Sequence, residues 1–109
     1  MTKNELINKL YNLPKLIEEA ENKVIASNEM VLHAKALVLS IEDRLLLEGA
    51  IDGKNAEARA AQMREKTFTE RRNIQPCENQ LSIDRACLNR LNNELAVCKA
   101  IAGILKGVE

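Results

Sequence analysis

Three cysteines and one histidine are the side chains with the most obvious chemistry, and their spacing limits what that chemistry can be. Cys77, Cys87 and Cys98 lie ten and eleven residues apart, and His33 is far upstream. Zinc sites are built from closely spaced Cys or His pairs, which this chain lacks. An odd number of cysteines in one helical pattern favours a reduced, cytoplasmic protein in which Cys acts as a small apolar side chain. We therefore expect no metal ion and no cofactor.

Acidic side chains could supply general acid–base chemistry, but their arrangement indicates a solvated surface. Glu18, Glu19 and Glu21 follow one another along a charged stretch, and the sequence pattern offers no nucleophile to accompany them. The chain also has no phosphate-binding glycine loop and no nucleophile elbow. These features predict that the protein is not an enzyme.

A basic segment near the middle of the chain is the best candidate for binding an anion. Its candidate contact residues are Lys54, Arg64, Lys66, Phe68, Arg71 and Arg72. Cationic side chains bind phosphates, and an aromatic ring can stack on a base of single-stranded nucleic acid. However, Glu65 and Glu70 are interleaved here, and sixteen basic residues balance sixteen acidic ones over the chain. A solvated connector is favoured, and a nucleic-acid contact is the alternative.

The stretch DGKNAEARAAQ combines a turn with the start of a helix. Asp52 and Gly53 are typical of a turn in which Gly53 adopts a positive φ, and Asn55 is a strong N-cap residue. Arg59 can pair with a nearby carboxylate. The alternative to this structural interpretation is a functional one, in which amides at the helix start bind an anion together with Lys54.

This stretch resembles a motif in small, uncharacterised helical proteins of tailed bacteriophages and prophages. In those proteins a Gly-Lys-Asn-Ala-Glu-x-Arg turn and cap precedes a long, charged helix. The matching residues are Gly53, Lys54, Asn55, Ala56, Glu57 and Arg59. The clear match covers only about residues 52–62, and the family has no settled activity. The resemblance therefore implies a helical fold and a phage origin, hence the cytoplasm of a bacterial host, more than it implies a function.

Apolar residues recur every three or four positions in two long stretches, as they do along the seam of a coiled coil. The predicted seam of the first stretch consists of Leu10, Leu13, Ile17, Ala20, Val24, Ser27, Val31, Ala34, Val38, Ile41 and Leu45. Pro14 favours the first turn of a new helix or a kink in a continuing one, and Gly49 suits the left-handed position just after a helix. The predicted helices span about residues 3–11, 13–48, 55–66 and 76–106.

These elements predict an all-α fold. Two long helices joined by a connector most simply form a long, coiled-coil-like antiparallel hairpin. The chain has 109 residues, which is enough for one small domain, so we expect a single helical domain over 1–109. The short N-terminal and connector helices complete it.

Part of the first long helix is apolar on more than its seam. The additional apolar residues are Ile25, Met30, Leu32, Leu37, Leu39 and Leu46. One neighbouring helix covers one face, so a second apolar face needs a second partner. We expect these six residues to form an interface between copies of the chain, in a dimer or a larger helical bundle. Charged residues interrupt the stretch, so we expect no membrane span.

Together these patterns favour a non-enzymatic, homo-oligomeric helical scaffold or adaptor that binds another protein, and the resemblance implies that a phage encodes it. Two alternatives remain open. One is a small nucleic-acid accessory protein that uses the basic segment 64–72. The other is a phage inhibitor that sequesters a component of the host.

Overall fold

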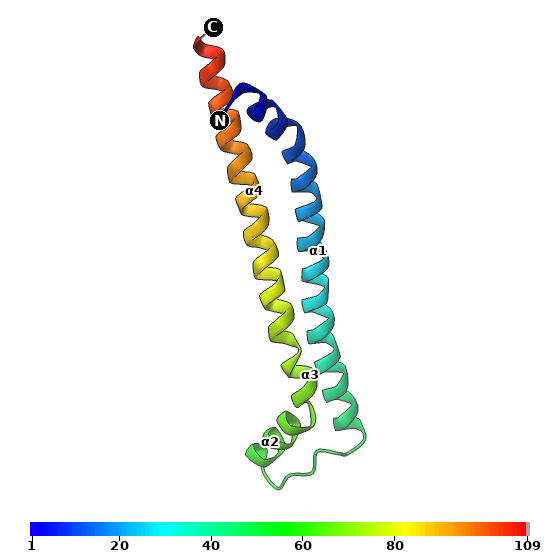
Figure 1. Ribbon diagram of the computed structural model, residues 1–109. Coiled ribbons are helices and arrows are strands. Elements are labelled where there is room, and N and C mark those ends of the chain that lie inside the picture. Colours follow the sequence, from blue (N-terminus) through cyan, green and yellow to red (C-terminus); the bar gives the residue numbers. More distant parts are fainter. Residues whose placement is uncertain (109) are drawn as a thin grey trace. The chain divides into compact units, whose positions relative to one another are not determined.

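The computed structural model describes residues 1–108, and most of these residues are helical. In chain order these are α1 (Lys3–Leu47), α2 (Ala56–Lys66), α3 (Phe68–Arg72) and α4 (Ile74–Val108) (Figure 1). The structure is 89% helical, and no strand occurs among the described residues. The predicted all-α fold is therefore confirmed.

The start and end of α1 follow from local sequence signals. The Thr2 hydroxyl accepts a hydrogen bond from the amide of Glu5, and the Glu5 carboxylate accepts one from the amide of Thr2, which makes a capping box. At the other end Gly49 has a φ of 69°. The amides of Gly49 and Ala50 donate to the carbonyl oxygens of Leu46 and Leu45, and this pairing closes the helix in a Schellman motif.

The expected break near Pro14 is absent, because α1 is one helix and Pro14 lies inside it. Proline lacks the amide hydrogen that would bond to the carbonyl four residues earlier, so the helix interior loses one hydrogen bond. Leu13 and Ile17, on either side of Pro14, are both buried. Burial of the seam on both sides of the proline explains why the helix continues, and the predicted helices 3–11 and 13–48 are corrected to a single α1.

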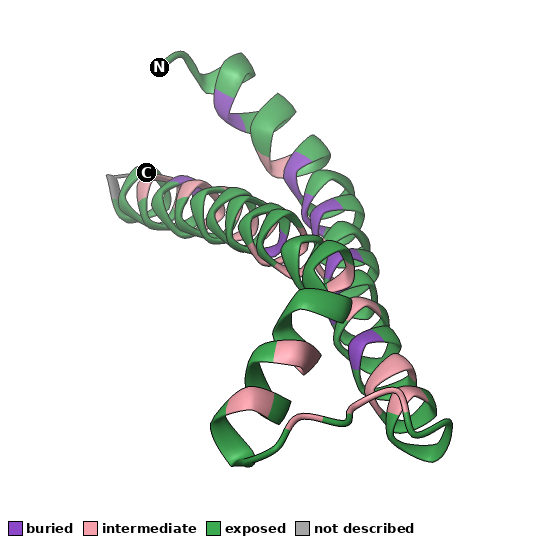
Figure 2. Cartoon of the chain, turned by 90° about the horizontal axis from the view of Figure 1, so that it is seen from below, coloured by how far each residue is buried: buried purple, intermediate pink, exposed green. Residues whose placement is uncertain are grey.

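Burial along α1 follows the predicted seam. All eleven seam positions are buried or half-buried, and most other positions of the helix are exposed. Figure 2 shows the buried residues recurring along one side of α1. The heptad pattern therefore predicted correctly which side of α1 packs.

Contacts divide the chain into two compact units. The terminal unit comprises Met1–Ala26 and the chain from Ser82 onward, and the turn unit comprises Ser27–Leu81. In each unit a segment of α1 runs antiparallel to a segment of α4, so the predicted helical hairpin is present in both (Figure 1). The single domain expected over 1–109 stays a prediction.

The terminal unit has an apolar core closed by one ion pair. Its buried centre is Leu6, Leu13 and Cys98, packed against Leu10, Leu91, Leu95, Ile101 and Ala102. Lys9 Nζ lies 2.8 Å from Glu94 Oε1. The hydrogen bond and charge of Glu94 raise the pKa of the Lys9 ammonium above its usual value.

The turn unit is held by a seam and by two polar links. Ser27, Val31 and Val38 are buried on α1, and Leu81 is buried on α4. Lys35 Nζ lies 3.5 Å from Glu78 Oε1 of α4, and Glu42 pairs with Arg71 of α3. These links fix α3 and the start of α4 beside the C-terminal half of α1.

Candidate functional site

The stretch 52–62 folds as a turn that is bonded to its own helix. Asn55 Oδ1 accepts a hydrogen bond of 2.8 Å from the amide of Ala58, which confirms Asn55 as the N-cap of α2. The side-chain amide of Gln62 bridges back to the turn. Its Oε1 accepts from the amide of Gly53 at 2.7 Å, and its Nε2 donates to Asp52 Oδ1 at 2.7 Å. The role of Gln62 is visible only in the folded turn.

The requirement for glycine at position 53 is steric. We expected Gly53 to adopt a positive φ, but Gly49 is the only such residue that the structure describes, so that prediction is wrong. A Cβ at position 53 would lie 2.7 Å from the backbone nitrogen of Arg59 and 2.8 Å from the carbonyl carbon of Ala58. Glycine therefore lets the turn touch the first turn of α2. Arg59 Nη1 donates to the Gly53 carbonyl oxygen at 3.2 Å, and no ion pair joins Arg59 to a carboxylate of residues 1–108.

The start of α2 is bonded in part to its own cap residue. The amide of Ala58 bonds to the Asn55 side chain, and the amide of Arg59 bonds to the Asn55 carbonyl oxygen at 3.0 Å. These donors are occupied within the chain. This geometry supports the structural interpretation of the motif, and an anion site at Lys54 stays a prediction.

Thr67 is the buried centre of the link between α2, α3 and α1, a role that was not predicted from the sequence. Its side chain is 0% exposed. Thr67 Oγ1 donates to the carbonyl oxygen of Met63 at 2.6 Å and accepts from Nε of Arg71 at 2.8 Å. Arg71 in turn pairs with the Glu42 carboxylate. The spacing of four residues on each side of Thr67 is the one signal in the sequence that points to this chain of bonds.

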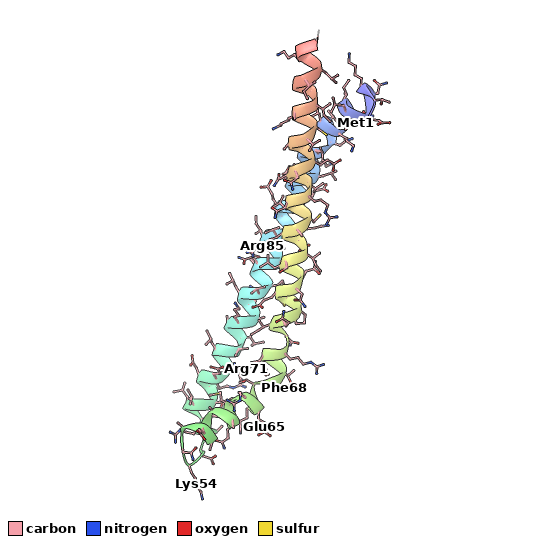
Figure 3. The ribbon with its side chains drawn as sticks, turned by 90° about the vertical axis from the view of Figure 1, so that its left-hand side faces the viewer. Met1, Lys54, Glu65, Phe68, Arg71 and Arg85 are labelled. Atoms are coloured by element: carbon pink, nitrogen blue, oxygen red, sulfur yellow. The ribbon has the colours of Figure 1, made fainter. Side chains whose placement is uncertain are left out.

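The structure separates the predicted nucleic-acid contacts into engaged and free residues. Lys54, Arg64, Lys66 and Arg72 are exposed, and Phe68 is 61% exposed. The guanidinium of Arg71 is instead occupied by Thr67 and Glu42. Figure 3 shows Lys54 at the tip of the turn, apart from Phe68 and Arg71. Lys54 and Arg71 therefore do not share one free basic surface, and a nucleic-acid contact through the other residues stays a prediction.

The predicted interface residues are all exposed. Their exposed fractions are 58% for Ile25, 59% for Met30, 59% for Leu32, 50% for Leu37, 61% for Leu39 and 59% for Leu46. Exposure of these side chains is what an interface between chains requires. The interface itself stays a prediction.

These residues do not share one face of α1. Met30 and Leu32 are the neighbours of Val31, which is buried, and each residue of a helix is rotated by about 100° from the one before it. They therefore project from opposite flanks of the seam, and Leu37 and Leu39 do the same around Val38.

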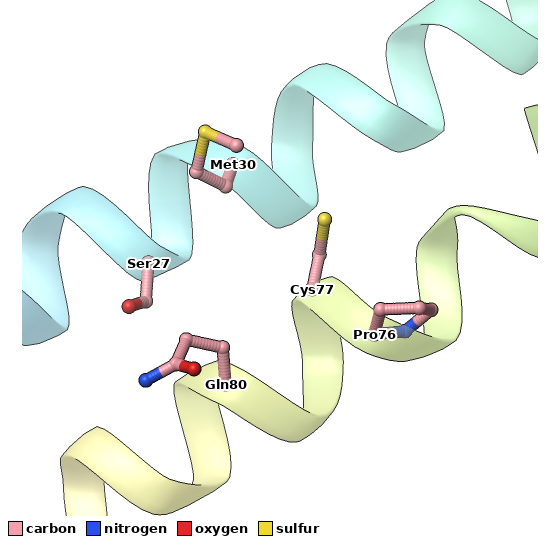
Figure 4. A pocket seen from close by; sticks show the side chains of 5 residues that line it. All are labelled: Ser27, Met30, Pro76, Cys77 and Gln80. Carbon is pink, nitrogen blue, oxygen red and sulfur yellow. The ribbon is translucent and has the colours of Figure 1, made fainter.

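Hollows on both sides of the seam agree with this division. On one flank Met30 lines a groove of about 170 Å³ with Ser27, Pro76, Cys77 and Gln80. In Figure 4 the Cys77 side chain points toward α1 in this groove. On the other flank Leu39 lines an open hollow of about 410 Å³ with Lys35, Val38, Glu42, Arg71 and Ile74. A single partner helix cannot cover both flanks.

By length and composition alone, α1 could also cross a membrane. A window of 18 residues has a mean hydropathy of 1.4, and 17% of it is buried. The sequence analysis expected no span, because charged residues interrupt the stretch. A helix in water whose apolar face binds another protein meets the same criterion. The finding therefore agrees with an apolar surface on α1 that the described residues leave uncovered, and it does not by itself indicate a span.

The cysteines have three different environments. Cys98 is 1% exposed in the terminal core, where it packs as a small apolar side chain as expected. Cys77 is half-buried in the groove beside Met30, and Cys87 is exposed. Across residues 1–108 no group of three or more His, Cys, Asp and Glu side chains could hold a metal ion.

Comparison with protein-family models, with curated proteins and with solved structures found no match to this chain. The resemblance of residues 52–62 to phage proteins therefore stays a prediction. Among the features described above, the exposed apolar residues of α1 on both flanks of its seam form the most extensive candidate surface.

Proposed function

We propose that the protein is a non-enzymatic helical scaffold or adaptor that self-associates through α1. The observation that carries this proposal is the apolar row of Leu32, Leu39 and Leu46, whose side chains are about three-fifths exposed. Full burial of a leucine stabilises a structure by about 1.5–3 kcal/mol, so covering what remains exposed contributes about 1–2 kcal/mol for each side chain. In a symmetric dimer the row of each copy covers the row of the other copy, so both become buried.

The proposed setting is the cytoplasm of a bacterial host, in which a phage-encoded oligomer presents its remaining surfaces to another protein. The row of Met30 and Leu37 and the groove beside Cys77 lie on the opposite flank of the seam. They stay available when a partner covers the row of Leu32, Leu39 and Leu46. The nucleic-acid alternative has less support, because Arg71 is engaged by Glu42 and Thr67.

Static light scattering tests the proposal. The wild-type chain should have at least the mass of a dimer at micromolar concentration. Replacing Leu32 and Leu39 with lysine should yield a monomer, because two charges would have to be buried without partners. The double variant Met30→Lys with Leu37→Lys is the matched control, with the same change of charge on the opposite flank, and should keep the wild-type mass. A monomeric wild type would contradict the proposal.

A further inference from the structure

Within the turn unit, the seam that α4 forms with α1 continues into α3. Two ion pairs show this, because both keep the same register. From Lys35 to Glu42, α1 advances by seven residues, and from Glu78 to Arg71 the chain that faces it steps back by seven. Since the register does not change, α3 lies against α1 as a continuation of α4.

Burial shows that this seam extends to the end of α2. Within residues 63–74, the side chains that are buried or half-buried are those of Met63, Thr67, Glu70 and Ile74. They are four, three and four residues apart, which is the spacing of a coiled-coil seam. In the register of the two ion pairs they face the last part of the α1 seam, which consists of Val38, Ile41 and Leu45.

This part of the seam is weaker than the part that α4 covers, because it contains a carboxylate. Glu70 is half-buried, and no ion pair or side-chain hydrogen bond joins it to any residue that the structure describes. A charged group that loses water without gaining a partner opposes packing. In addition, neither α2 nor α3 contains a buried residue. Little apolar burial therefore holds these two helices against α1.

Both ends of this segment are places where the chain can bend. Residues 48–55 are not helical, and Asn73 interrupts the helix between α3 and α4. The amide of Gly53 donates a hydrogen bond to the side chain of Gln62 in α2, so the turn can stay attached to α2 when the segment moves. This arrangement lets α2 and α3 leave α1 while α4 keeps its contacts.

We propose that α2 and α3, residues 56–72, form a strap that opens about Asn73 and uncovers the end of the α1 seam around Ile41. The ion pair of Arg71 with Glu42 fastens the strap. These two side chains are 45% and 22% exposed, so salt in the solvent screens their attraction. The inference goes beyond the proposed self-association, because the strap covers the seam of α1 and not its exposed apolar row.

Labelling of a cysteine under the strap measures its opening. Cys77 and Cys87 are first replaced by alanine, and Cys98 stays because it is 1% exposed. Ile41→Cys then places a thiol under the strap, and Ala34→Cys places one beside the start of α4, at a position that is also half-buried. A neutral maleimide should label Ile41→Cys at least about tenfold faster, because a weakly packed segment opens at a lower cost in free energy. Added salt should speed the labelling of Ile41→Cys only.

A change at the polar seam position tests the cause of opening. Glu70→Leu adds an apolar contact with α1 and should slow the labelling of Ile41→Cys at least about fivefold. Glu65→Leu is the matched control, because it makes the same change at an exposed position of α2 and should alter the rate by less than about twofold. Glu42→Gln should raise the rate about two- to fivefold and remove its dependence on salt.

Hydrogen exchange gives a measurement that needs no variant. In the wild type the amides of α2 and α3 should exchange as one group, at least about tenfold faster than those of α4 residues 81–95. Equal rates in the two groups would overturn the inference. So would equal labelling of Ile41→Cys and Ala34→Cys, or a labelling rate that Glu70→Leu leaves unchanged. Circular dichroism of each variant and of the cysteine background controls for helicity.

Discussion

Gly53 allows the turn after α1 to lie directly against the first turn of α2. Replacing it with alanine should destabilise α2 locally by about 1–3 kcal/mol, because the added Cβ would meet backbone atoms that cannot move aside. The effect should appear as faster hydrogen exchange of the α2 amides.

Gly103 is the matched control for this substitution. It lies inside α4, and a Cβ there would meet nothing within 4 Å. Gly103→Ala should stabilise the protein by about 0.5–1 kcal/mol, since alanine loses less conformational freedom in a helix. Unchanged α2 exchange in Gly53→Ala would show that the turn does not depend on this close approach.

Thr67 is the second residue on which the turn unit depends. Thr67→Val keeps the shape of the side chain but leaves the Met63 carbonyl without the hydroxyl and Arg71 Nε without its acceptor. We expect a loss of about 1–3 kcal/mol in the free energy of unfolding, measured with urea. The same substitution at exposed Thr69 should change it by less than about 0.5 kcal/mol. Equal effects at the two positions would contradict the assigned role of Thr67.

The role of a residue could be predicted where its hydrogen bond joins residues that are close in the sequence. The caps at Thr2 and Asn55 join residues three apart, so they follow from sequence alone. Gln62 reaches Gly53 across nine residues, and Arg71 reaches Glu42 across twenty-nine. Such bonds depend on how the turn and the helices pack, and no pattern in the sequence specifies them.

At the scale of the elements, α1 contains a proline that its packing tolerates. Pro14→Ala restores the amide that can bond to the Leu10 carbonyl, so we expect the protein to be stabilised by about 1–3 kcal/mol. Pro76→Ala is the control, because Pro76 is the third residue of α4, where no helical hydrogen bond is lost. Thermal melts of both variants check this. If the melting temperature of Pro14→Ala is no higher than that of Pro76→Ala, the expected stabilisation is contradicted.

The long helices could be predicted because periodicity depends only on helix geometry. The heptad spacing identified the packed side of α1 from Leu10 to Leu45. The helix predicted over 55–66 ends where α2 ends, at Lys66, but α3 (Phe68–Arg72) was not predicted, since a segment of five residues is too short to show a helical period. The continuity of α1 through Pro14 was missed because packing outweighed a local preference.

At the scale of the whole molecule, the choice of interface depends on rotation around α1. The sequence analysis grouped six exposed apolar residues into one interface. Rotation of about 100° per residue already separates Met30 from Leu32, so this division was available from sequence. The open hollow on α1 that Glu29, Leu32, His33 and Ala36 line was not available from sequence, because it depends on how these side chains lie.

Self-association makes a prediction for thermal stability that needs no variant. If the chain folds as a dimer, a tenfold rise in concentration adds about 1.4 kcal/mol to the stability of each dimer. With an unfolding entropy of about 2.1 cal/mol/K per residue, the melting temperature should rise by about 3 °C for each tenfold step.

The two lysine variants show which surface is responsible. Leu32→Lys with Leu39→Lys should abolish the concentration dependence, because the folded state of that variant has no second copy to lose. Met30→Lys with Leu37→Lys should retain it, since those side chains lie on the other flank of the seam. Scanning calorimetry over a hundredfold range of concentration measures both. A wild-type melting temperature that stays constant over that range would mean that no second copy covers the apolar row in the folded protein, and the stability of α1 would then have to come from its seam with α4 alone.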